Sequence, residues 1–329
     1  MRFGLLGRAA LVGVAATLVL TACGGGSSEG TNAAKDGPED TSITVGTLPI
    51  PDIAPLHIAM QKGWFKEEGL EVKAETIQGS AVGLNKLAAG GLDFMLGNYM
   101  SVLKAQAQGT GKFKYVADSF QAAPDTFNLM VGKDSKIRTL ADLKGKKVAL
   151  NTKGNVGDLA VASTLRQAGL SNTDISIQEI PFPNMGAALA AGTIDAAWCG
   201  EPYISEMQTK LGAHKLADTM TGPTADFPVA GWSVSESYAT KNPKTVAAFQ
   251  RAMAKAQQLA ASDRTAVEAV LPTYTQIQSD VAKIITLGTF PTSLSAQRIQ
   301  RVADLMVELK FLDKKIDVSN MIIPPPPAK

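Results

Sequence analysis

The feature that most constrains the fold of this chain is an internal duplication. Residues 87–93 read LAAGGLD, and residues 189–195 read LAAGTID. In both copies, apolar residues at helical spacing precede a glycine that fits a helix C-cap, and an apolar stretch typical of a strand follows. A single copy is weak evidence, but its repetition predicts two similar α/β units.

The segments around the two copies repeat as well, so that each unit reads strand, helix, strand, helix, strand. The strand candidates are residues 43–48, 92–96, 147–152, 175–180 and 194–198. Strands that alternate with helices imply parallel sheets covered on both faces, and such sheets bind ligands beyond the carboxyl ends of their strands. Two units of this kind predict a cleft between two lobes.

The last part of the chain changes character. Residues 243–261 and 295–309 have helical apolar periodicity and begin with Asn-Pro and Ser signals, and no clear strand pattern separates them. We expect this helical tail to return to the first lobe, with crossings near residues 127–133 and 230–235 acting as a hinge. The predicted domains are lobe 1 (42–130 plus 235–323), lobe 2 (131–234) and a disordered proline-rich tail (324–329).

The first residues indicate export. Arg2 and Arg8 flank the start of an apolar run that ends at Leu20, which is too short for a transmembrane helix and typical of a signal peptide, residues 1–22. The LTAC sequence that ends at Cys23 resembles a bacterial lipobox, which implies lipidation of Cys23 and anchoring to the outer face of the cytoplasmic membrane. An ordinary secretory signal with an incidental cysteine is the alternative. Residues 23–41 are rich in Gly, Ser and Asn and are expected to form a flexible tether.

Composition excludes several classes of function. The whole chain has 32 basic and 30 acidic residues, so no nucleic-acid partner is indicated. Its two cysteines are Cys23 and Cys199, which leaves no internal disulfide once Cys23 is lipidated. The two histidines, His57 and His214, form no cluster of metal ligands, and we expect neither a metal nor a cofactor.

A series of short motifs resembles one protein family. They include Gly63-Trp64-Phe65, the GLEV stretch at 69–72, the DLKGKKV stretch at 142–148, and Glu201-Pro202. In their order and spacing they are similar to the nitrate/sulfonate/taurine-binding proteins of ABC importers, also described as NMT1/THI5-like, over nearly the whole mature chain. The resemblance implies a type II periplasmic-binding-protein fold, a monomer that closes on a small molecule and docks on the transmembrane subunits of an ABC permease.

Candidate ligand-binding residues follow from the ends of the expected strands and from nearby aromatic side chains. Backbone N–H groups at helix starts favour a polar or anionic group there, and aromatic rings offer stacking surfaces. Ser80, Asn155 and Asn184 are equally compatible with plain N-caps. The candidates are Pro51, Asp52, Ile53, Ser80, Asn98, Tyr99, Phe127, Thr152, Asn155, Asn184, Trp198, Glu201 and Trp232. Phe120 is interpreted as core, and Asp93 and Asp195 as structural.

The ligand itself stays open at this point. No arginine occurs between Arg8 and Arg138, so residues 42–130 of lobe 1 offer no arginine clamp for an anion. An anion would need helix N-termini, hydroxyls and Lys153, whereas Glu201 suits a ligand with N–H or cationic groups. Both a small sulfonate-, nitrate- or taurine-like anion and a nitrogen heterocycle are therefore retained.

Two other classes of function compete with solute binding. Some THI5-like proteins synthesise a pyrimidine precursor, and His57 and Lys62 lie in the corresponding first helix, but the cysteine-rich iron-binding segment of those enzymes is absent. A ligand-sensing module would ordinarily be fused to an output domain. Cys199 is interpreted as a small buried hydrophobe rather than a reactive thiol. We therefore expect a binding protein with no catalytic residue.

Overall fold

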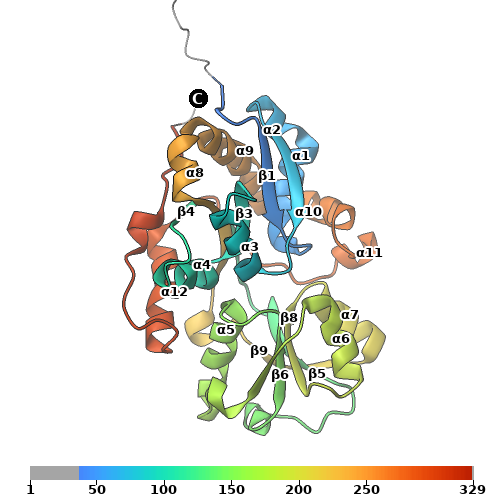
Figure 1. The fold of residues 1–329 in the computed structure, drawn as a ribbon. Helices are drawn as coiled ribbons and strands as arrows, with labels where there is room; N and C mark the ends of the chain where they lie inside the picture. The colour runs from blue at the N-terminus through green and yellow to red at the C-terminus, as the bar shows by residue number, and fades with distance from the viewer. Residues whose placement is uncertain (1–36, 328–329) are drawn as a thin grey trace, which may run out of the picture. The chain divides into compact units, whose positions relative to one another are not determined.

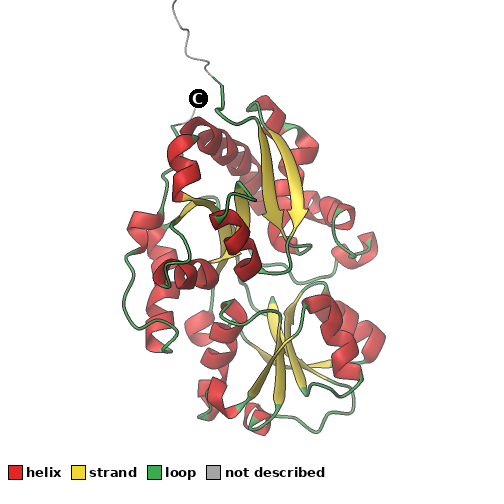
Figure 2. Cartoon of the chain, in the orientation of Figure 1, coloured by secondary structure: helices red, strands yellow, loops and turns green. Residues whose placement is uncertain are grey.

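A computed structural model of the chain describes residues 37–327, in which the strands form two five-stranded sheets, one in each lobe. Figure 1 labels the elements, and Figure 2 shows helices flanking the strands of both lobes. Both sheets are mixed, with parallel and antiparallel pairs of strands. Among the described residues, no helix is long and apolar enough to cross a bilayer.

Lobe 1 is built on the sheet β2-β1-β3-β10-β4. β1, β2 and β3 run parallel, and β10 lies antiparallel between β3 and β4. Its strands are β1 (Ser42–Thr47), β2 (Glu71–Thr76), β3 (Phe94–Asn98), β4 (Phe113–Gln121) and β10 (Pro228–Ser235). Its helices are the single turn η1 (Pro51–Ile53), α1 (Ala54–Lys62), α2 (Trp64–Glu67), α3 (Ser80–Ala88) and α4 (Tyr99–Ala107).

Lobe 2 repeats this plan with the sheet β7-β6-β8-β5-β9. β6, β7 and β8 run parallel, and β5 lies antiparallel between β8 and β9. Its strands are β5 (Phe127–Val131), β6 (Lys147–Leu150), β7 (Ser176–Glu179), β8 (Ala196–Gly200) and β9 (His214–Asp218). Its helices are α5 (Val156–Leu165), α6 (Phe182–Ala190) and α7 (Tyr203–Leu211).

The duplicated motif performs the same structural step in both lobes. Gly90 and Gly192 follow α3 and α6 with φ values of 76° and 68°, the left-handed conformation that glycine adopts most easily. In lobe 1 the Asp93 carboxylate accepts the backbone N–H of Thr44 at 2.7 Å, and in lobe 2 the Asp195 carboxylate accepts that of Lys147 at 2.8 Å. Each aspartate therefore binds the first parallel strand of its own sheet.

The two connections between the lobes lie earlier in the chain than residues 127–133 and 230–235. Phe127 already pairs with Gly200 inside the sheet of lobe 2, and Ala230 pairs with Asn98 inside the sheet of lobe 1. The crossings are consequently the segments 122–126 and 219–227, which touch through the backbone hydrogen bond from Ala122 N to Phe227 O.

The helical tail packs on lobe 1, in contact with α1, β4 and α4. Its helices are α8 (Glu236–Lys241), α9 (Pro243–Ser262), α10 (Arg264–Val270), α11 (Ser279–Ala282) and α12 (Ala296–Glu308). Gln250 of α9 donates to the carbonyl oxygens of Val116, Ile323 and Pro324, so the start of the proline-rich tail is held against the lobe. Pro324, Pro325 and Pro327 are exposed.

The described part of the expected tether is bound at its end. The Glu39 carboxylate accepts the backbone N–H groups of Lys244 and Thr245 at the start of α9, and Tyr238 donates to Asp40. A carboxylate at a helix N-terminus satisfies N–H groups that have no partner within the helix. The ordered lobe therefore begins before Ser42. Cys23 and the expected signal peptide lie outside the described residues.

Candidate functional site

Two small cavities lie between the lobes, at the edge where the parallel strands of both sheets end. Their volumes are about 50 and 20 Å³, and both are lined by Ile50, Asp52, Phe127 and Phe182. We call them together the inner cleft. The first is also lined by Leu48, Ser80, Leu96, Asn98, Asn151, Asn155, Val156, Trp198, Val229 and Ala230, and the second by Pro51, Phe120, Thr126, Gly200, Glu201, Tyr203 and Thr286.

The polar wall of lobe 1 consists of Ser80 and Asn98. Asn98 ends β3 and caps α4, since its Oδ1 accepts the backbone N–H of Ser101 at 2.8 Å. Its Nδ2 and backbone N–H both reach the hydroxyl oxygen of Ser80, at 2.9 and 3.2 Å. The two side chains therefore form a fixed pair in which the Ser80 hydroxyl proton remains available to a ligand.

The polar wall of lobe 2 is centred on Asn155, which caps α5. Its Oδ1 accepts the backbone N–H of Gly157 at 2.7 Å, and its Nδ2 donates to Asn151 Oδ1 and Thr152 Oγ1, both at 2.6 Å. Asn155 is thus both the N-cap that the sequence allows and a residue of the inner cleft. Thr152 supports it and does not line the cavities.

Aromatic rings form the third wall. Phe127 and Trp198 stack with centroids 5.0 Å apart and planes inclined by 9°, and Phe182 lies 6.1 Å from Trp198. The indole N–H of Trp198 donates to Thr219 Oγ1 at 2.9 Å, and this hydroxyl donates to the Phe127 carbonyl at 2.7 Å. The Trp198 ring is therefore fixed by the second crossing segment and offers a rigid stacking surface.

The Trp198→Phe variant is expected to lower the free energy of unfolding by about 1–2 kcal/mol, because the Thr219 hydroxyl loses its buried donor. Trp232→Phe is the matched control, since the indole N–H of Trp232 is buried without a hydrogen-bond partner. Chemical denaturation of both variants measures the difference. Equal losses would show that the Trp198–Thr219 bond contributes nothing measurable.

Two buried carboxyl groups face the inner cleft. Asp52 of η1 is 4 % exposed, and burial raises its pKa to about 7. Glu201 is 7 % exposed; burial raises its pKa, and the backbone N–H and hydroxyl of Ser205 donate to it at 3.1 and 2.8 Å. No lysine or arginine is among the residues that line either cavity. The only ionisable carboxyl or cationic side chains in this lining are therefore carboxyl groups.

The lobes approach each other closely beside the inner cleft. The Ser101 hydroxyl of lobe 1 donates to the Gly154 carbonyl of lobe 2 at 3.1 Å. A Cβ atom at Gly79 would lie 2.6 Å from the Thr152 methyl carbon, which is closer than carbon atoms pack. With cavities smaller than most solutes, these contacts describe a closed cleft, and a ligand needs the lobes to separate before it can enter.

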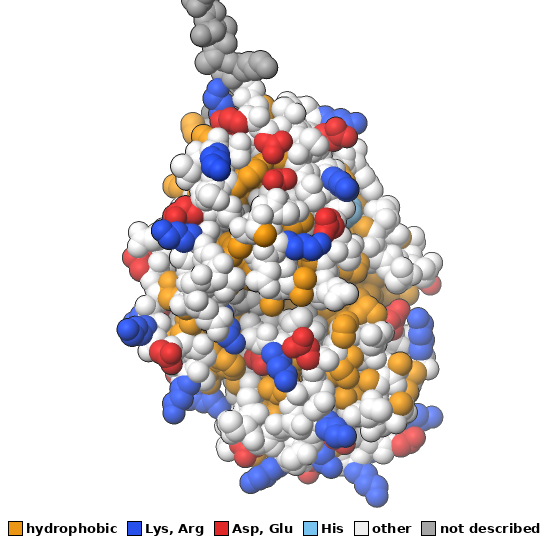
Figure 3. Space-filling view, viewed as in Figure 1, with side chains coloured by type: hydrophobic (Ala, Val, Ile, Leu, Met, Phe, Trp, Pro, Cys, Tyr) orange, Lys and Arg blue, Asp and Glu red, His pale blue; other side chains and the backbone are white. Residues whose placement is uncertain are grey.

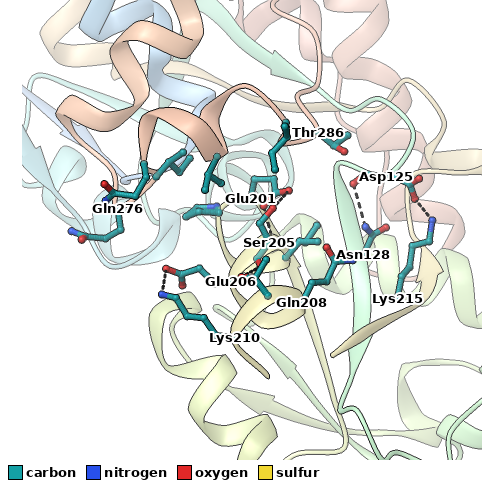
Figure 4. A pocket seen from close by; sticks show the side chains of 17 residues that line it. Asp125, Asn128, Glu201, Ser205, Glu206, Gln208, Lys210, Lys215, Gln276 and Thr286 are labelled. Carbon is teal, nitrogen blue, oxygen red and sulfur yellow. Dashed lines mark hydrogen bonds and ion pairs between the residues drawn. The ribbon is translucent and has the colours of Figure 1, made fainter. Parts of the chain in front are cut away.

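A larger pocket of about 390 Å³ adjoins the inner cleft at Glu201 and Thr286, and we call it the outer pocket. Figure 4 shows α7 and β5 on one side and the 276–286 segment of the tail on the other. Its lysines are paired, Lys210 with Glu206 at 3.2 Å and Lys215 with Asp125 at 2.6 Å. The outer pocket consequently adds no unpaired cation to the cleft.

The structure brings most of the predicted ligand-binding residues together. Pro51, Asp52, Ser80, Asn98, Phe127, Asn155, Trp198 and Glu201 line the inner cleft, and their role in binding stays a prediction. Ile53, Tyr99 and Trp232 are buried in lobe 1 outside the lining, where Tyr99 packs on Tyr115 and Trp232 on Phe249. Asn184 is exposed on α6.

The sequence reasoning missed Phe182, and it considered Asn151 at a strand end without retaining it among the candidates. Phe182 begins α6 two residues before Asn184, so its position at a helix start was the available signal. Asn151 follows β6 directly, next to residues that were selected. Thr286, which lines the second cavity, belongs to the helical tail, where no predicted strand end indicated a site residue.

Other polar groups lie away from the inner cleft. His57 stacks on Tyr274 with centroids 3.9 Å apart, and burial lowers the pKa of His57 to about 4. Cys199 is fully buried in β8, and burial raises the pKa of its thiol. Within residues 37–327, no group of three or more His, Cys, Asp or Glu side chains is arranged to hold a metal ion.

Comparison with known proteins assigns the chain to a protein family. The profile described as NMT1/THI5 like matches residues 50–266, which is more than half of the sequence. The chain belongs to this family. A relative from Bacillus subtilis (strain 168), named "Putative aliphatic sulfonates-binding protein", is 28% identical over 324 residues, covering 95% of this chain and 93% of the relative.

Solved structures show that the fold, with its two mixed α/β sheets, is that of the periplasmic binding proteins. The alkanesulfonate-binding protein SsuA from Xanthomonas axonopodis pv. citri, bound to MOPS, matches with a TM-score of 0.73 and 24% identity, over 87% of this chain and 99% of that one. The periplasmic nitrate-binding protein NrtA from Synechocystis PCC 6803 matches with a TM-score of 0.67 and 18% identity, over 80% and 76%.

Proposed function

We propose that this protein is the extracytoplasmic solute-binding lipoprotein of an ABC importer, which captures a small molecule by hinge closure and delivers it to the permease. The inner cleft carries the proposal, because polar and aromatic residues from both lobes converge there at the carboxyl edges of two duplicated sheets. A ligand that contacts both lobes only when they are closed shifts the population towards the closed state. The permease then recognises the surfaces of the closed lobes.

The relatives support this proposal through what they are named to bind. Their names include an aliphatic sulfonates-binding protein and a nitrate/nitrite binding protein, both small-solute binders. The proposed ligand is accordingly a small molecule, either a sulfonate-, nitrate- or taurine-like anion or a nitrogen heterocycle. Figure 3 shows Lys and Arg interspersed with Asp and Glu on the face that it draws, without a large patch of one sign that would indicate a nucleic-acid partner.

The anchor and the location are part of the proposal. The lipobox-like sequence before Cys23 and the short apolar run favour a chain held by lipid at the outer face of the cytoplasmic membrane. Metabolic labelling of the expressed chain with a radioactive fatty acid should mark the wild type and leave Cys23→Ser unlabelled. Label that persists in the Cys23→Ser variant would argue against this anchor.

The enzyme alternative receives less support from the site. His57, the histidine of the first helix, is stacked on Tyr274 and lines neither cavity of the inner cleft. Lys62, at the end of α1, is exposed. Neither side chain is placed to act on a molecule bound between the lobes, which favours binding over catalysis.

A thermal-shift screen tests the proposed function. The mature chain carrying Cys23→Ser is melted with sulfonates, nitrate, bicarbonate, pyrimidines, thiamine and flavins. A solute present at 100 times its Kd should add about 2.7 kcal/mol to the free energy of unfolding and raise the melting temperature visibly. A folded sample that responds to no small solute would contradict the assignment as a binding protein.

A further inference from the structure

We propose that the inner cleft selects a small planar solute that presents N–H donors and is cationic or neutral, with Asp52 as its main partner, and that it rejects sulfonates and nitrate. The inference rests on the proposed function and narrows its ligand to one chemical class. The proposed ligand class differs from the anions for which the relatives are named, because it is inferred from the charged residues of this chain alone.

The balance of charge around the inner cleft disfavours an anion. Asp52 and Glu201 both line it, both are more than nine-tenths buried, and no Lys or Arg joins them in the lining. Asp52 takes part in none of the ion pairs found among residues 37–327. A buried anion is costly unless it is paired, so a bound anion beside these carboxyl groups would be strongly disfavoured.

Most of the helix N-termini that would otherwise receive an anion are already occupied. At α4 and α5 the side chains of Asn98 and Asn155 already accept the N–H groups of Ser101 and Gly157, and Glu201 accepts that of Ser205 in α7. Proline occupies the first turn of α6 and removes donors there. Of α3, α4, α5, α6 and α7, only α3 has neither a side chain that accepts its first N–H groups nor a proline in its first turn; its N-cap residue is Gly79.

The aromatic wall of the inner cleft favours a planar ligand. The Phe127, Trp198 and Phe182 rings provide flat apolar faces next to Asp52. A planar ring stacks on such faces, and a ring that bears an amidine or amino group can donate two parallel hydrogen bonds to one carboxylate. Benzamidine and cytosine combine these properties as a cationic and a neutral probe.

The surroundings of Asp52 determine how binding depends on pH. The Tyr274 hydroxyl lies near Asp52 and is buried without a hydrogen-bond partner. Burial, and after it the negative charge of Asp52, raises the pKa of Tyr274. His57, stacked on Tyr274, has a pKa of about 4 and is neutral between pH 6 and 8. On β4, Asp118 is paired with Arg298. Glu201 is the other carboxyl group of the cleft, and burial raises its pKa as well.

Calorimetric titration of the mature Cys23→Ser chain with benzamidine, cytosine, methanesulfonate and nitrate at pH 6, 7 and 8 tests the inference. A cation needs an ionised Asp52, so benzamidine affinity should rise by roughly tenfold between pH 6 and pH 8, as expected for a pKa of about 7. The anions should not bind. Anion binding that weakens as the pH rises would overturn the inference and leave the proposed function standing.

Variants separate Asp52 from general effects on the fold. Asp52→Asn should weaken benzamidine binding at least about tenfold at pH 8 and remove the pH dependence. Glu201→Gln should weaken it less and keep the pH dependence. Asp313→Asn, at an exposed position, is the matched control and should bind like the parent chain.

Two further outcomes are decisive. Unchanged benzamidine affinity in Asp52→Asn would exclude Asp52 as the main partner and overturn the inference. If neither N–H donor probe binds at any pH, the ligand class is also wrong. A simultaneous failure of methanesulfonate and nitrate would then count against the proposed function as well.

Discussion

Replacing Asp52 with Asn is expected to raise the free energy of unfolding at pH 8 by about 4 kcal/mol and to change it little near pH 4. Burial raises the pKa of Asp52 from 3.8 to about 7, and a tenfold change in proton affinity corresponds to about 1.4 kcal/mol. Between pH 4 and pH 7, the Asp52 carboxyl group therefore holds a proton more often in the folded chain than in the unfolded chain. Stability from this group is therefore lost as the pH rises from 4 to 7.

The measurement is a set of urea unfolding curves of the two ligand-free proteins at pH values from 4 to 8. The difference between them should grow steadily with pH and level off above pH 7. Asp118→Asn is a useful contrast, because its carboxylate is paired with Arg298 and its loss should destabilise the protein. A difference between Asp52→Asn and the parent that is independent of pH would show that Asp52 is ionised throughout.

Replacing Gly79 with Ala is expected to weaken ligand binding by about one to two orders of magnitude while leaving ligand-free stability nearly unchanged. Gly79 has a φ of 169°, an extended conformation open to any residue, so no backbone strain arises. The added methyl group would instead lie 2.6 Å from the Thr152 methyl carbon across the cleft. Overpacking typically costs ~1–3 kcal/mol, which here falls on the closed state alone.

Thr152→Ser supplies the control for this prediction. Serine lacks the methyl group with which the Cβ atom of Gly79→Ala would overlap. It keeps the hydroxyl that accepts a hydrogen bond from Asn155. The double variant should regain most of the affinity measured for the solute that responds in the thermal-shift screen. If the single variant binds normally, or if the double variant does not recover, contact between Gly79 and Thr152 does not limit closure.

Local sequence patterns predicted the elements that the duplication shares. The glycine after α3 and α6, the aspartates that follow, and the parallel strands all depend on short stretches of chain, and each of them appears in both lobes. The connections between the lobes lie earlier than predicted because β5 pairs with β8 and β10 pairs with β3. Both partners are far away in the sequence. No local periodicity reveals which sheet an antiparallel strand joins.

The sequence predicted where along the chain the candidate site residues lie better than it predicted which way their side chains point. Strand ends identified Asp52, Asn98 and Trp198 because the topology brings all such ends to one edge. Tyr99 directly follows β3 and Trp232 lies within β10, yet both rings are buried in lobe 1, against Tyr115 and Phe249. Which face a ring takes depends on the packed neighbours, and these are visible only in three dimensions.

The burial of Cys199 makes lobe motion accessible to fluorescence. Its thiol is fully enclosed in β8 and has a raised pKa, so maleimide dyes should leave it untouched in the folded protein. Once Cys23 is replaced, cysteines introduced at the exposed positions Val82 on α3 and Leu211 on α7 become the reactive thiols. A donor and acceptor pair there would report the distance between the lobes in single molecules, with the natural cysteine left in place.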